Sequence, residues 1–243
     1  MKPGRYKKSL HKAWRRLQNR IHGGRRILVL GDSHCGVYEY CFDQGYLVPH
    51  LLNCEIVAGA TAYGLNNDQS ATMAWHRFDR ALKRYRDFDV VLIMLGEVDC
   101  SYALWQKSER TGLPPEAFFD RCFAGLERLL QRVRSEGGAA RKVIVAGASL
   151  PTIADQYAAV QENELRRSIA ATQMQRTQLV LAYNACLAEF AYAHDVRYFD
   201  LTAETLDPET RLVAQCYLAE PDDHHLSHPA TGKLWAASLL RCL

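Results

Sequence analysis

The sequence predicts a single α/β domain with a parallel sheet covered by helices on both faces, and three observations support this. Five short apolar runs are spread along the 243 residues, segments with helical spacing separate them, and no linker, repeat or low-complexity stretch divides the chain. Alternation of strands and helices is typical of doubly wound folds. A chain of this length can bury most of the surface that it exposes when unfolded, so one core suffices.

The predicted strands are short segments rich in apolar residues, and several of them are continuous apolar runs. The strongest is DVVLIML, residues 89–95, which is rich in β-branched side chains. Continuous apolar runs indicate strands that are covered on both faces, as in parallel sheets. The five predicted strands are, in order, residues 27–30, 55–57, 89–95, 142–148 and 196–201.

Between the strands, apolar residues recur at the spacing of three and four that is typical of amphipathic helices. The last of these segments has Pro229 near its start, a position that favours helix initiation. The predicted helices cover residues 69–86, 115–135, 173–194 and 229–242, and residues 149–172 form a longer excursion.

The positive charge of the chain is concentrated at its start. Residues 1–26 hold ten of the 30 lysines and arginines and no acidic residue, so the rest carries 20 basic and 27 acidic residues, a net charge of −7. An acidic body argues against general nucleic-acid binding. We therefore divide the chain into a basic N-terminal helix or tail, residues 1–24, and one domain, residues 25–243.

An apolar stripe runs through this tail. Leu10, Trp14, Leu17 and Ile21 lie at spacings of four, three and four, on one face of a helix. The stripe either packs on the body of the protein, as helical stripes usually do, or contacts an anionic membrane or a partner protein through residues 7–21.

The sequence favours a cytoplasmic protein, with a peripheral place at the inner membrane face if the tail binds lipid. No apolar run reaches the roughly 18 residues of a membrane span, and the basic start lacks the apolar core of a signal peptide. The eight cysteines form no C-x-x-C pair, so we expect reduced thiols.

Three predicted strands end in polar or glycine-rich turns. The first gives GDSHC (31–35), the second leads into GATAYGLNN (59–67), and the third gives LGEVDC (95–100). Asp32 or Ser33 could simply cap the next helix. Because open α/β folds keep their sites at the carboxyl ends of the strands, Ser33 is also placed as a nucleophile would be.

The segment EPDDHHLSHPAT (220–231) supplies what such a serine needs. A hydroxyl becomes a nucleophile when a histidine takes its proton, and an acid fixes the tautomer of that histidine and stabilises its cation. Donors aimed at the oxyanion complete the set, and glycine-rich turns can offer backbone N–H groups.

These motifs resemble the SGNH hydrolases, the GDSL-like esterases and acyltransferases, over residues 27–243. GDSH matches the first block, AGATAYG the second, and DDHHLS fits the pattern D-x-x-H-L-S. The resemblance implies a flavodoxin-like three-layer α/β/α domain with a five-stranded parallel sheet. It also implies Ser33 as nucleophile, His225 as base, Asp222 as its orienting acid, and the N–H groups of Ser33 and Gly59 as oxyanion donors, with Gly64 competing for the place of Gly59.

The third block departs from the G-x-N-D pattern of the family. The chain has Gly96-Glu97-Val98-Asp99, and valine cannot donate a hydrogen bond. Asn66 or Asn67 could supply the missing amide, backbone donors alone could serve, or the protein could be slow or inactive. GDSH with a GE-x-DC turn resembles SGNH-like proteins associated with bacterial surface polysaccharides, where Glu97 and Asp99 would bind a substrate hydroxyl or brace the site.

The remaining polar residues permit two interpretations each. Asp32 and His34 flank the nucleophile and could touch substrate, cap or pack. Arg176 and Asn184 could reach the site from their helix. We expect no metal, since three histidines within five residues of one loop match no zinc spacing, and we expect Cys35 and Cys100, which flank the site, to be buried as small apolar residues.

The sequence therefore predicts a serine-dependent ester hydrolase or O-acyltransferase without a cofactor, acting on an ester of a small molecule or glycan. By resemblance, the acyl group is acetyl and the substrate is a sugar or polysaccharide. The alternative is a catalytically weak or inactive module of the same fold that binds a glycan or a biosynthetic partner.

Overall fold

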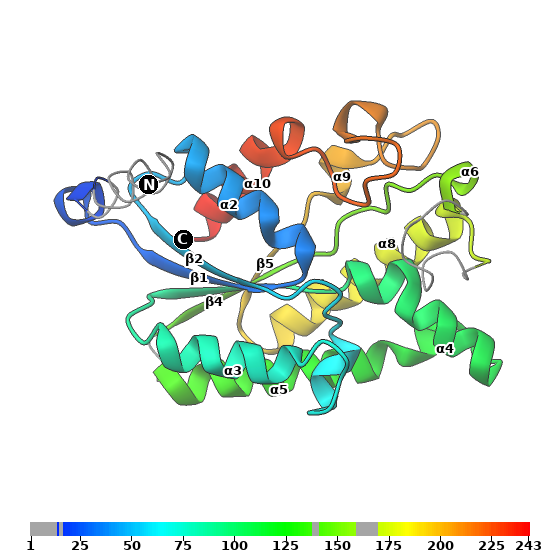
Figure 1. Cartoon of the computed structure of the whole chain (residues 1–243), viewed down its shortest axis with the longest axis horizontal. Coiled ribbons are helices and arrows are strands. Elements are labelled where there is room, and N and C mark those ends of the chain that lie inside the picture. The colour runs from blue at the N-terminus through cyan, green and yellow to red at the C-terminus, as the bar shows by residue number, and fades with distance from the viewer. Residues whose placement is uncertain (1–13, 15–16, 138–140, 159–169) are drawn as a thin grey trace, which may run out of the picture.

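The computed structural model describes residue 14 and residues 17–137, 141–158 and 170–243 (Figure 1). At its centre, every pair of neighbouring strands is parallel, in the order β2-β1-β3-β4-β5. The strands are β1 (Arg26–Gly31), β2 (Leu51–Ile56), β3 (Val90–Met94), β4 (Lys142–Ala146) and β5 (Arg197–Phe199). The predicted single α/β domain with a five-stranded parallel sheet is confirmed.

The three inner strands follow the predicted apolar runs, whereas the edge strand β2 does not. All five residues of β3 are buried, because β1 and β4 flank it and helices cover both faces. Strand β2 lies at the edge, is only half-buried, and begins at Leu51 instead of the predicted residue 55. Its exposed Asn53 interrupts the apolar pattern, so the sequence marks only the end of the strand.

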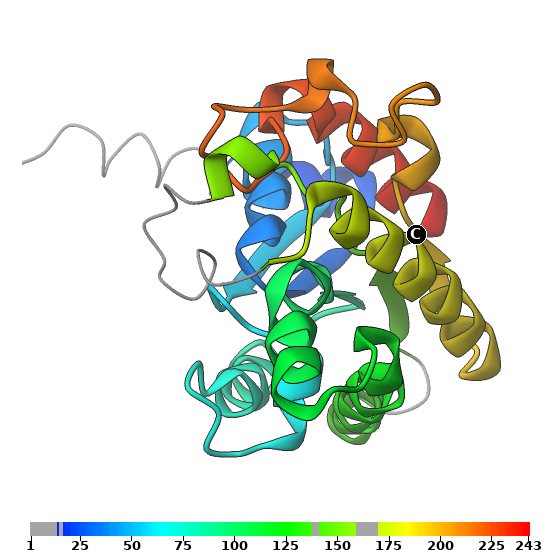
Figure 2. The same cartoon turned by 90° about the vertical axis from the view of Figure 1, so that its right-hand side faces the viewer.

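The helices cover the two faces of the sheet in separate layers (Figures 1 and 2). Alternate residues of β1 divide between two cores: Ile27 and Val29 pack toward one layer, and Leu28 and Leu30 toward the other. One layer holds α2 (Gly36–Gln44) and α10 (His228–Cys242), and the other holds α3 (Ala74–Arg84), α5 (Phe119–Gly137) and α8 (Gln173–Ala193).

Shorter helical segments fill the connections, and most lie where the strands end. These segments are η1 (Ser33–Cys35), η2 (Tyr63–Asn66), the π-helical η3 (Asp99–Ala103), α4 (Leu104–Thr111), η4 (Pro115–Phe118), α6 (Asp155–Ala158), α9 (Thr202–Thr205) and η5 (Gln215–Tyr217). Of these, α4 is a helix that the sequence did not predict.

Two glycines permit close packing at the carboxyl edge of the sheet. A Cβ on Gly31 would lie 2.2 Å from the carbonyl oxygen of Met94, the last residue of β3. Gly96 has a φ of +131°, and a Cβ there would lie 2.4 Å from the ring of Tyr183 on α8. A larger residue at position 31 would separate β1 from β3, and one at position 96 would separate the turn after β3 from α8, so both glycines set the geometry of this edge.

The N-terminal helix turns its polar side to the body and its apolar side to solvent. Residues 17–22 are helical, and the half-buried Asn19 donates its amide to the carbonyl of Pro49 at 3.1 Å. Trp14, Leu17 and Ile21 are 59%, 47% and 66% exposed. The interpretation that the stripe packs on the body is therefore wrong for these three residues; its first residue lies outside the described part. None of the described helices has the length and apolar character needed to cross a membrane.

The eight cysteines all lie in the described residues and are free thiols. Cys35 and Cys100 are fully buried, as expected for small apolar residues. Only Cys216, on η5, is exposed.

Candidate active site

Ser33 lies in the turn directly after β1, at the carboxyl edge of the sheet that Figure 2 faces. Asp32 caps η1, because its Oδ1 accepts the backbone N–H of His34 at 2.9 Å. Ser33 is half-buried, and among the described residues its hydroxyl has no hydrogen-bond partner. The capping role thus falls to Asp32 and leaves the Ser33 hydroxyl available to another molecule.

His225 lies between η5 and α10 and is held by a carboxylate. Oδ1 of Asp223 is 2.7 Å from its Nδ1 and also accepts its backbone N–H at 2.9 Å. An acid at Nδ1 favours the tautomer with the lone pair on Nε2, the form of a general base. The Nε2 atom is buried and unpartnered among the described residues, so no hydrogen bond joins it to Ser33. Such bonds are often long in unliganded enzymes.

The carboxylate on His225 is not the predicted one. The D-x-x-H pattern assigns Asp222, but the carboxylate that accepts the hydrogen bond of Nδ1 is that of Asp223. Asp223 accepts the N–H two positions on, which is the geometry of an Asx turn, and this turn places its carboxylate beside the ring. The sequence alone could not show which of the two adjacent aspartates contacts His225. The path of the loop determines which carboxylate reaches the ring.

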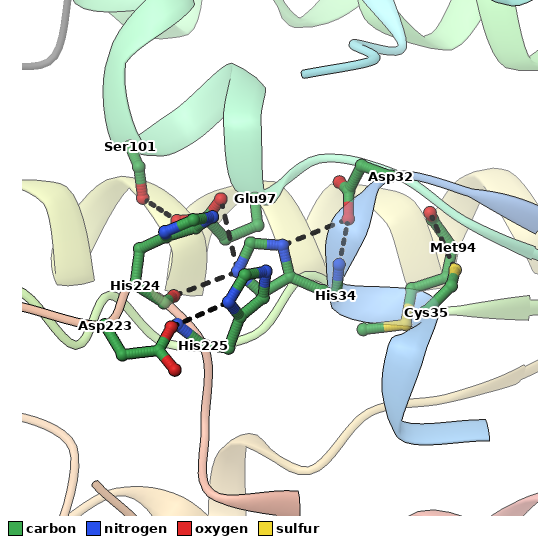
Figure 3. A network of polar contacts seen from close by, with 9 residues as sticks. All are labelled: Asp32, His34, Cys35, Met94, Glu97, Ser101, Asp223, His224 and His225. Carbon is green, nitrogen blue, oxygen red and sulfur yellow. Dashed lines mark hydrogen bonds and ion pairs between the residues drawn. The ribbon is translucent and has the colours of Figure 1, made fainter. Parts of the chain in front are cut away.

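A second imidazole, His34, occupies the centre of the site (Figure 3). It is 4% exposed, and its Nδ1 is 3.0 Å from Oδ1 of Asp32. Its Nε2 is 3.1 Å from the carbonyl oxygen of His224 and 3.4 Å from Oε2 of Glu97. Both ring nitrogens therefore face protein groups, and the expectation that Asp32, His34 and Glu97 touch substrate is replaced by a role in the framework of the site.

The charge of His34 follows from these neighbours. Burial alone would lower its pKa, but the carboxylates of Glu97 and Asp32 raise the pKa to about 9. Glu97 is 2% exposed, and its Oε1 accepts the hydroxyl of Ser101 at 2.5 Å. At neutral pH, His34 is thus an imidazolium between two buried carboxylates, an arrangement that offsets the cost of burying each charge.

The pKa of His225 is shifted in the opposite direction, to a lower value. Burial lowers its pKa, and the nearby charge of His34 lowers it further, against the opposing effect of Asp223. The rings of His34 and His225 lie with centroids 4.7 Å apart. Burial and His225 likewise lower the pKa of His228, the first residue of α10. His225 is therefore neutral at neutral pH, as a general base must be.

Backbone donors distinguish the two candidate glycines. The N–H of Gly64 is bound to Oγ1 of Thr61 at 2.9 Å. The N–H groups of Gly59 and Ser33 make no hydrogen bond within the described residues. Gly59 has a φ of +73°, which glycine adopts readily. The geometry favours Gly59 over Gly64 as an oxyanion donor.

The amide expected to replace the missing asparagine is already in use. Nδ2 of Asn66 donates to the carbonyls of Tyr63 at 3.0 Å and Arg121 at 2.7 Å, so it joins η2 to α5. The expectation that Asn66 is an oxyanion or substrate group is corrected accordingly. Val98 is 1% exposed and part of the apolar interior.

Asp99 braces the turn after β2. It is fully buried, and its carboxylate accepts the N–H groups of Ala62 at 2.7 Å and Tyr63 at 3.1 Å. Burial raises its pKa to about 6, although these N–H groups and the Cys122 thiol oppose the change. Of the two roles expected for Asp99, the structure supports bracing.

The two residues of the long helix α8 also serve the framework. Asn184 accepts the N–H of Ala148 at 2.8 Å and donates to its carbonyl at 2.9 Å, just beyond β4. Arg176 donates to the carbonyl of Ile153 at 2.7 Å. Sequence analysis missed Thr152, whose hydroxyl donates to the carbonyl of Asp223 at 2.9 Å, because threonines in loops carry no distinctive pattern.

Asp223, His224 and His225 offer side-chain atoms within 4.8 Å of one another, a spacing that a metal ion could bridge. All three are consecutive in one loop, and Asp223 and His225 use their facing atoms in a hydrogen bond with each other. This contact explains the proximity, so we assign no metal to the group.

A cavity of about 580 Å³ lies beside the segment that carries His225. The described residues that line it include amides, hydroxyls, two carboxylates and Tyr157, but no lysine, arginine or histidine. Thr152 lines it while bonding to Asp223, and Glu220 and Pro221 directly precede the Asp222-Asp223 pair. A second cavity between His34, His225 and His228 measures about 10 Å³ and is too small for a substrate group.

Comparison with known proteins relates the chain to others through its fold. No family model and no curated protein matches the sequence. Solved structures do match over most of the chain.

Est24, a carbohydrate acetylesterase from Sinorhizobium meliloti, has a TM-score of 0.59 and 16% identity, covering 90% of this chain and 100% of that one. The M. smegmatis aryl esterase gives the same values. A GDSL-like lipase from Bacteroides thetaiotaomicron has a TM-score of 0.57 at 16% identity, covering 89% and 86%. The chain therefore has the fold of these esterases and lipases.

Proposed function

We propose that the protein is a serine-dependent ester hydrolase, with Ser33 as nucleophile, His225 as base and Asp223 as orienting acid. The observation that carries the proposal is the His225 ring, whose Nδ1 binds a carboxylate while its buried Nε2 has no partner among the described residues. It lies against the turn that presents the unpartnered Ser33 hydroxyl. The fold shared with esterases adds support.

The reaction follows the chemistry of an activated serine. Ser33 Oγ attacks the ester carbonyl carbon while His225 Nε2 takes the hydroxyl proton, and the carbonyl electron pair moves to its oxygen. The intermediate collapses, the ester C–O bond breaks, and His225 returns the proton to the leaving alcohol. Water then attacks the acyl-serine while losing its proton to His225, the bond between Ser33 Oγ and the acyl carbon breaks, and His225 returns the proton to Ser33 Oγ as the carboxylic acid leaves. Asp223 stabilises the imidazolium in both halves.

The oxyanion would be bound by backbone groups alone. The free N–H groups of Ser33 and Gly59 are the candidate donors, and Val98 supplies no third one. Since removal of one donor costs roughly a hundredfold to a thousandfold in other hydrolases, we expect modest turnover on simple esters.

The substrate that we propose is an acetyl ester of a sugar or polysaccharide. The described residues that line the 580 Å³ cavity beside the His225 segment include amides, hydroxyls and two carboxylates, and these groups suit a polyhydroxylated ligand better than an anionic one. Two structural neighbours are named for carbohydrate esters, an acetyl xylan esterase and the carbohydrate acetylesterase Est24. Incubation with an acetyl donor and a sugar acceptor separates hydrolysis, which yields only acetate, from transfer, which yields acetylated sugar.

Hydrolysis of p-nitrophenyl acetate by wild type, Ser33→Ala and His225→Ala tests the proposal. Each variant should lose roughly a thousandfold or more in kcat, because the two residues act as one unit. Ser108→Ala and His76→Ala, at positions on α4 and α3, are matched controls that should retain full activity. Equal rates for wild type and Ser33→Ala would contradict the proposal and favour an inactive module of the same fold that binds a glycan. Calorimetric binding of acetylated glycans would then test that alternative.

A second proposal concerns where the protein acts. We propose that the exposed stripe of Trp14, Leu17 and Ile21 contacts an anionic membrane surface at its cytoplasmic side. Its apolar side chains face solvent, and ten basic residues in positions 1–26 complement acidic lipid headgroups.

Sedimentation with phosphatidylserine-containing vesicles tests membrane contact. Wild type should bind, and more weakly at high salt, whereas the triple variant Trp14→Ser/Leu17→Ser/Ile21→Ser should lose most binding. Tyr192→Ser, which removes another exposed aromatic side chain, is the control. Equal sedimentation of wild type and the triple variant would contradict membrane contact through the stripe and leave a protein partner as its occupant.

A further inference from the structure

The strongest feature that the proposed reaction leaves unused is the buried cluster of Asp32, His34 and Glu97. Each of the three is at most 4% exposed, and they come from the turns after β1 and β3. Burying an imidazolium and two carboxylates costs desolvation free energy, which their mutual contacts offset only when the geometry is held closely. Its contacts show what it does.

His34 joins the sheet to the loop that carries the base. Its Nδ1 is bound to Asp32 within its own turn, and its Nε2 donates to the carbonyl of His224, the residue before His225. The other side of the loop is held by the hydroxyl of Thr152 on the carbonyl of Asp223. His34 is thus the contact that fixes the loop to the edge where Ser33 lies.

Both contacts require a charged ring. A neutral imidazole has one N–H, so it can donate to Asp32 or to His224 but not to both. Glu97, 3.4 Å from Nε2, supplies the second negative charge that favours the protonated form. Ser101 holds Glu97 in place through its other oxygen.

The charge also acts on the base. The centroids of the His34 and His225 rings are 4.7 Å apart, so an imidazolium at His34 opposes a second positive charge on His225. The titratable groups that face the two rings are Asp32 and Glu97 from the strand turns, Asp223 and His224 from the loop, and His228 from α10.

We propose that His34 is a positioning residue: as an imidazolium held by Asp32 and Glu97, it tethers the loop that carries His225 and keeps the His225 ring neutral. This role rests on the proposed function, because it concerns the base of that reaction. Through the contact between His34 and Glu97, it accounts for two features of the sequence: the histidine directly after the proposed nucleophile, and the glutamate at the second position of GEVD, the third block that differs from the family pattern.

The test separates the tether from the charge. His34→Gln keeps an amide that can donate to the His224 carbonyl but removes the positive charge, whereas His34→Ala removes both. Glu97→Gln keeps the shape and the acceptor for Ser101 but removes the negative charge. His76→Gln is the matched histidine control, and circular dichroism with thermal unfolding establishes that each variant is folded.

The first measurement is an NMR pH titration of the histidine ring protons, which needs no activity. His34 should remain protonated at pH 7 in wild type and titrate at lower pH in Glu97→Gln. In His34→Gln the titration midpoint of His225 should rise by roughly one to two pH units, the effect expected from removing a unit charge about 5 Å away. An unmoved His225 midpoint, or a His34 that titrates at or below 6.5, would overturn the proposal.

The second measurement is the pH profile of kcat/KM on p-nitrophenyl acetate. The acidic limb of His34→Gln should move to higher pH, and His34→Ala should lose roughly tenfold to a hundredfold more kcat than His34→Gln at the pH optimum. If wild type shows no Ser33-dependent activity, the proposed function fails, while the NMR titration still decides the state of His34. If activity is present but both variants keep the wild-type profile, the role of His34 fails and the proposed function stands.

Discussion

Two polar regions meet at the carboxyl edge of the sheet, and they differ in how their polar atoms are used. In the turns after β1 and β3, the side chains of Asp32, His34 and Asp99 are buried and bound to protein groups. In the loop before α10, His225 is only partly buried and has one ring nitrogen without a partner in the described part. The first region is a framework and the second, by our proposal, is the reactive region, although both are rich in acids and histidines.

The largest expected effect comes from the reactive region. Asp223→Asn should lower kcat/KM roughly 100- to 10,000-fold, because an amide in place of the carboxylate loses the imidazolium partner and favours the wrong tautomer. Asp222→Asn is the matched variant and should lose less than about tenfold, since the contact to Nδ1 comes from its neighbour. Steady-state kinetics of the two proteins decide between the adjacent acids; a larger loss in Asp222→Asn would restore the predicted assignment.

The next effect, in the framework region, concerns stability rather than rate. Burial raises the pKa of Asp99 to about 6 from an ordinary value near 3.8, so the native state binds a proton more tightly than the unfolded state. Its contribution to stability is therefore greatest below the unfolded pKa and falls as pH rises through about 6. The difference reaches about 3 kcal/mol.

Asp99→Asn should remove this pH dependence. Urea unfolding of wild type and variant at pH 4, 5, 6 and 7 measures it as the change with pH in the difference between their free energies of unfolding. A difference that stays constant across this range would mean that Asp99 titrates normally despite its burial.

The smallest effect should come from Asn66, whose amide joins η2 to α5. Asn66→Ala should lower the free energy of unfolding by about 1–3 kcal/mol, because two backbone carbonyls lose their donor. The kcat of the folded protein should stay within about twofold if the amide has no oxyanion role, since loss of a true donor costs roughly a hundredfold or more. Asn67→Ala, at the exposed neighbour, is the control. A hundredfold loss of kcat in Asn66→Ala would show that the Asn66 amide does act as an oxyanion donor.

The sequence predicted the fold well because burial on both faces imposes a continuous apolar run, and the three inner strands β1, β3 and β4 carry one. It failed for β2, where an edge position tolerates Asn53, and for α4, which has a single buried residue, Leu104, to mark it. In both elements few residues are buried, so the apolar pattern of the sequence does not indicate where they begin and end.

The residues of the candidate site were predicted by type, and their contacts less well. Ser33 and His225 remain the predicted nucleophile and base, because a hydroxyl after a strand and a histidine before the last helix fit one chemistry. Asp222 and Asp223 cannot be separated without the path of the loop, since either could reach the ring. Asn66 and Asp99 are polar for structural reasons, and their type alone does not reveal which backbone groups lie near them.

The exposed thiol of Cys216 is a natural site for attaching a fluorescent dye. It lies on η5 between Gln215 and Tyr217, and both Gln215 and Leu218 line the 580 Å³ cavity. The other seven cysteines are buried or partly buried, so an environment-sensitive dye should attach mainly at this position without any substitution. The emission of such a dye would report whether a sugar, the substrate class that we propose, enters the cavity, even for a protein whose turnover is too slow to follow.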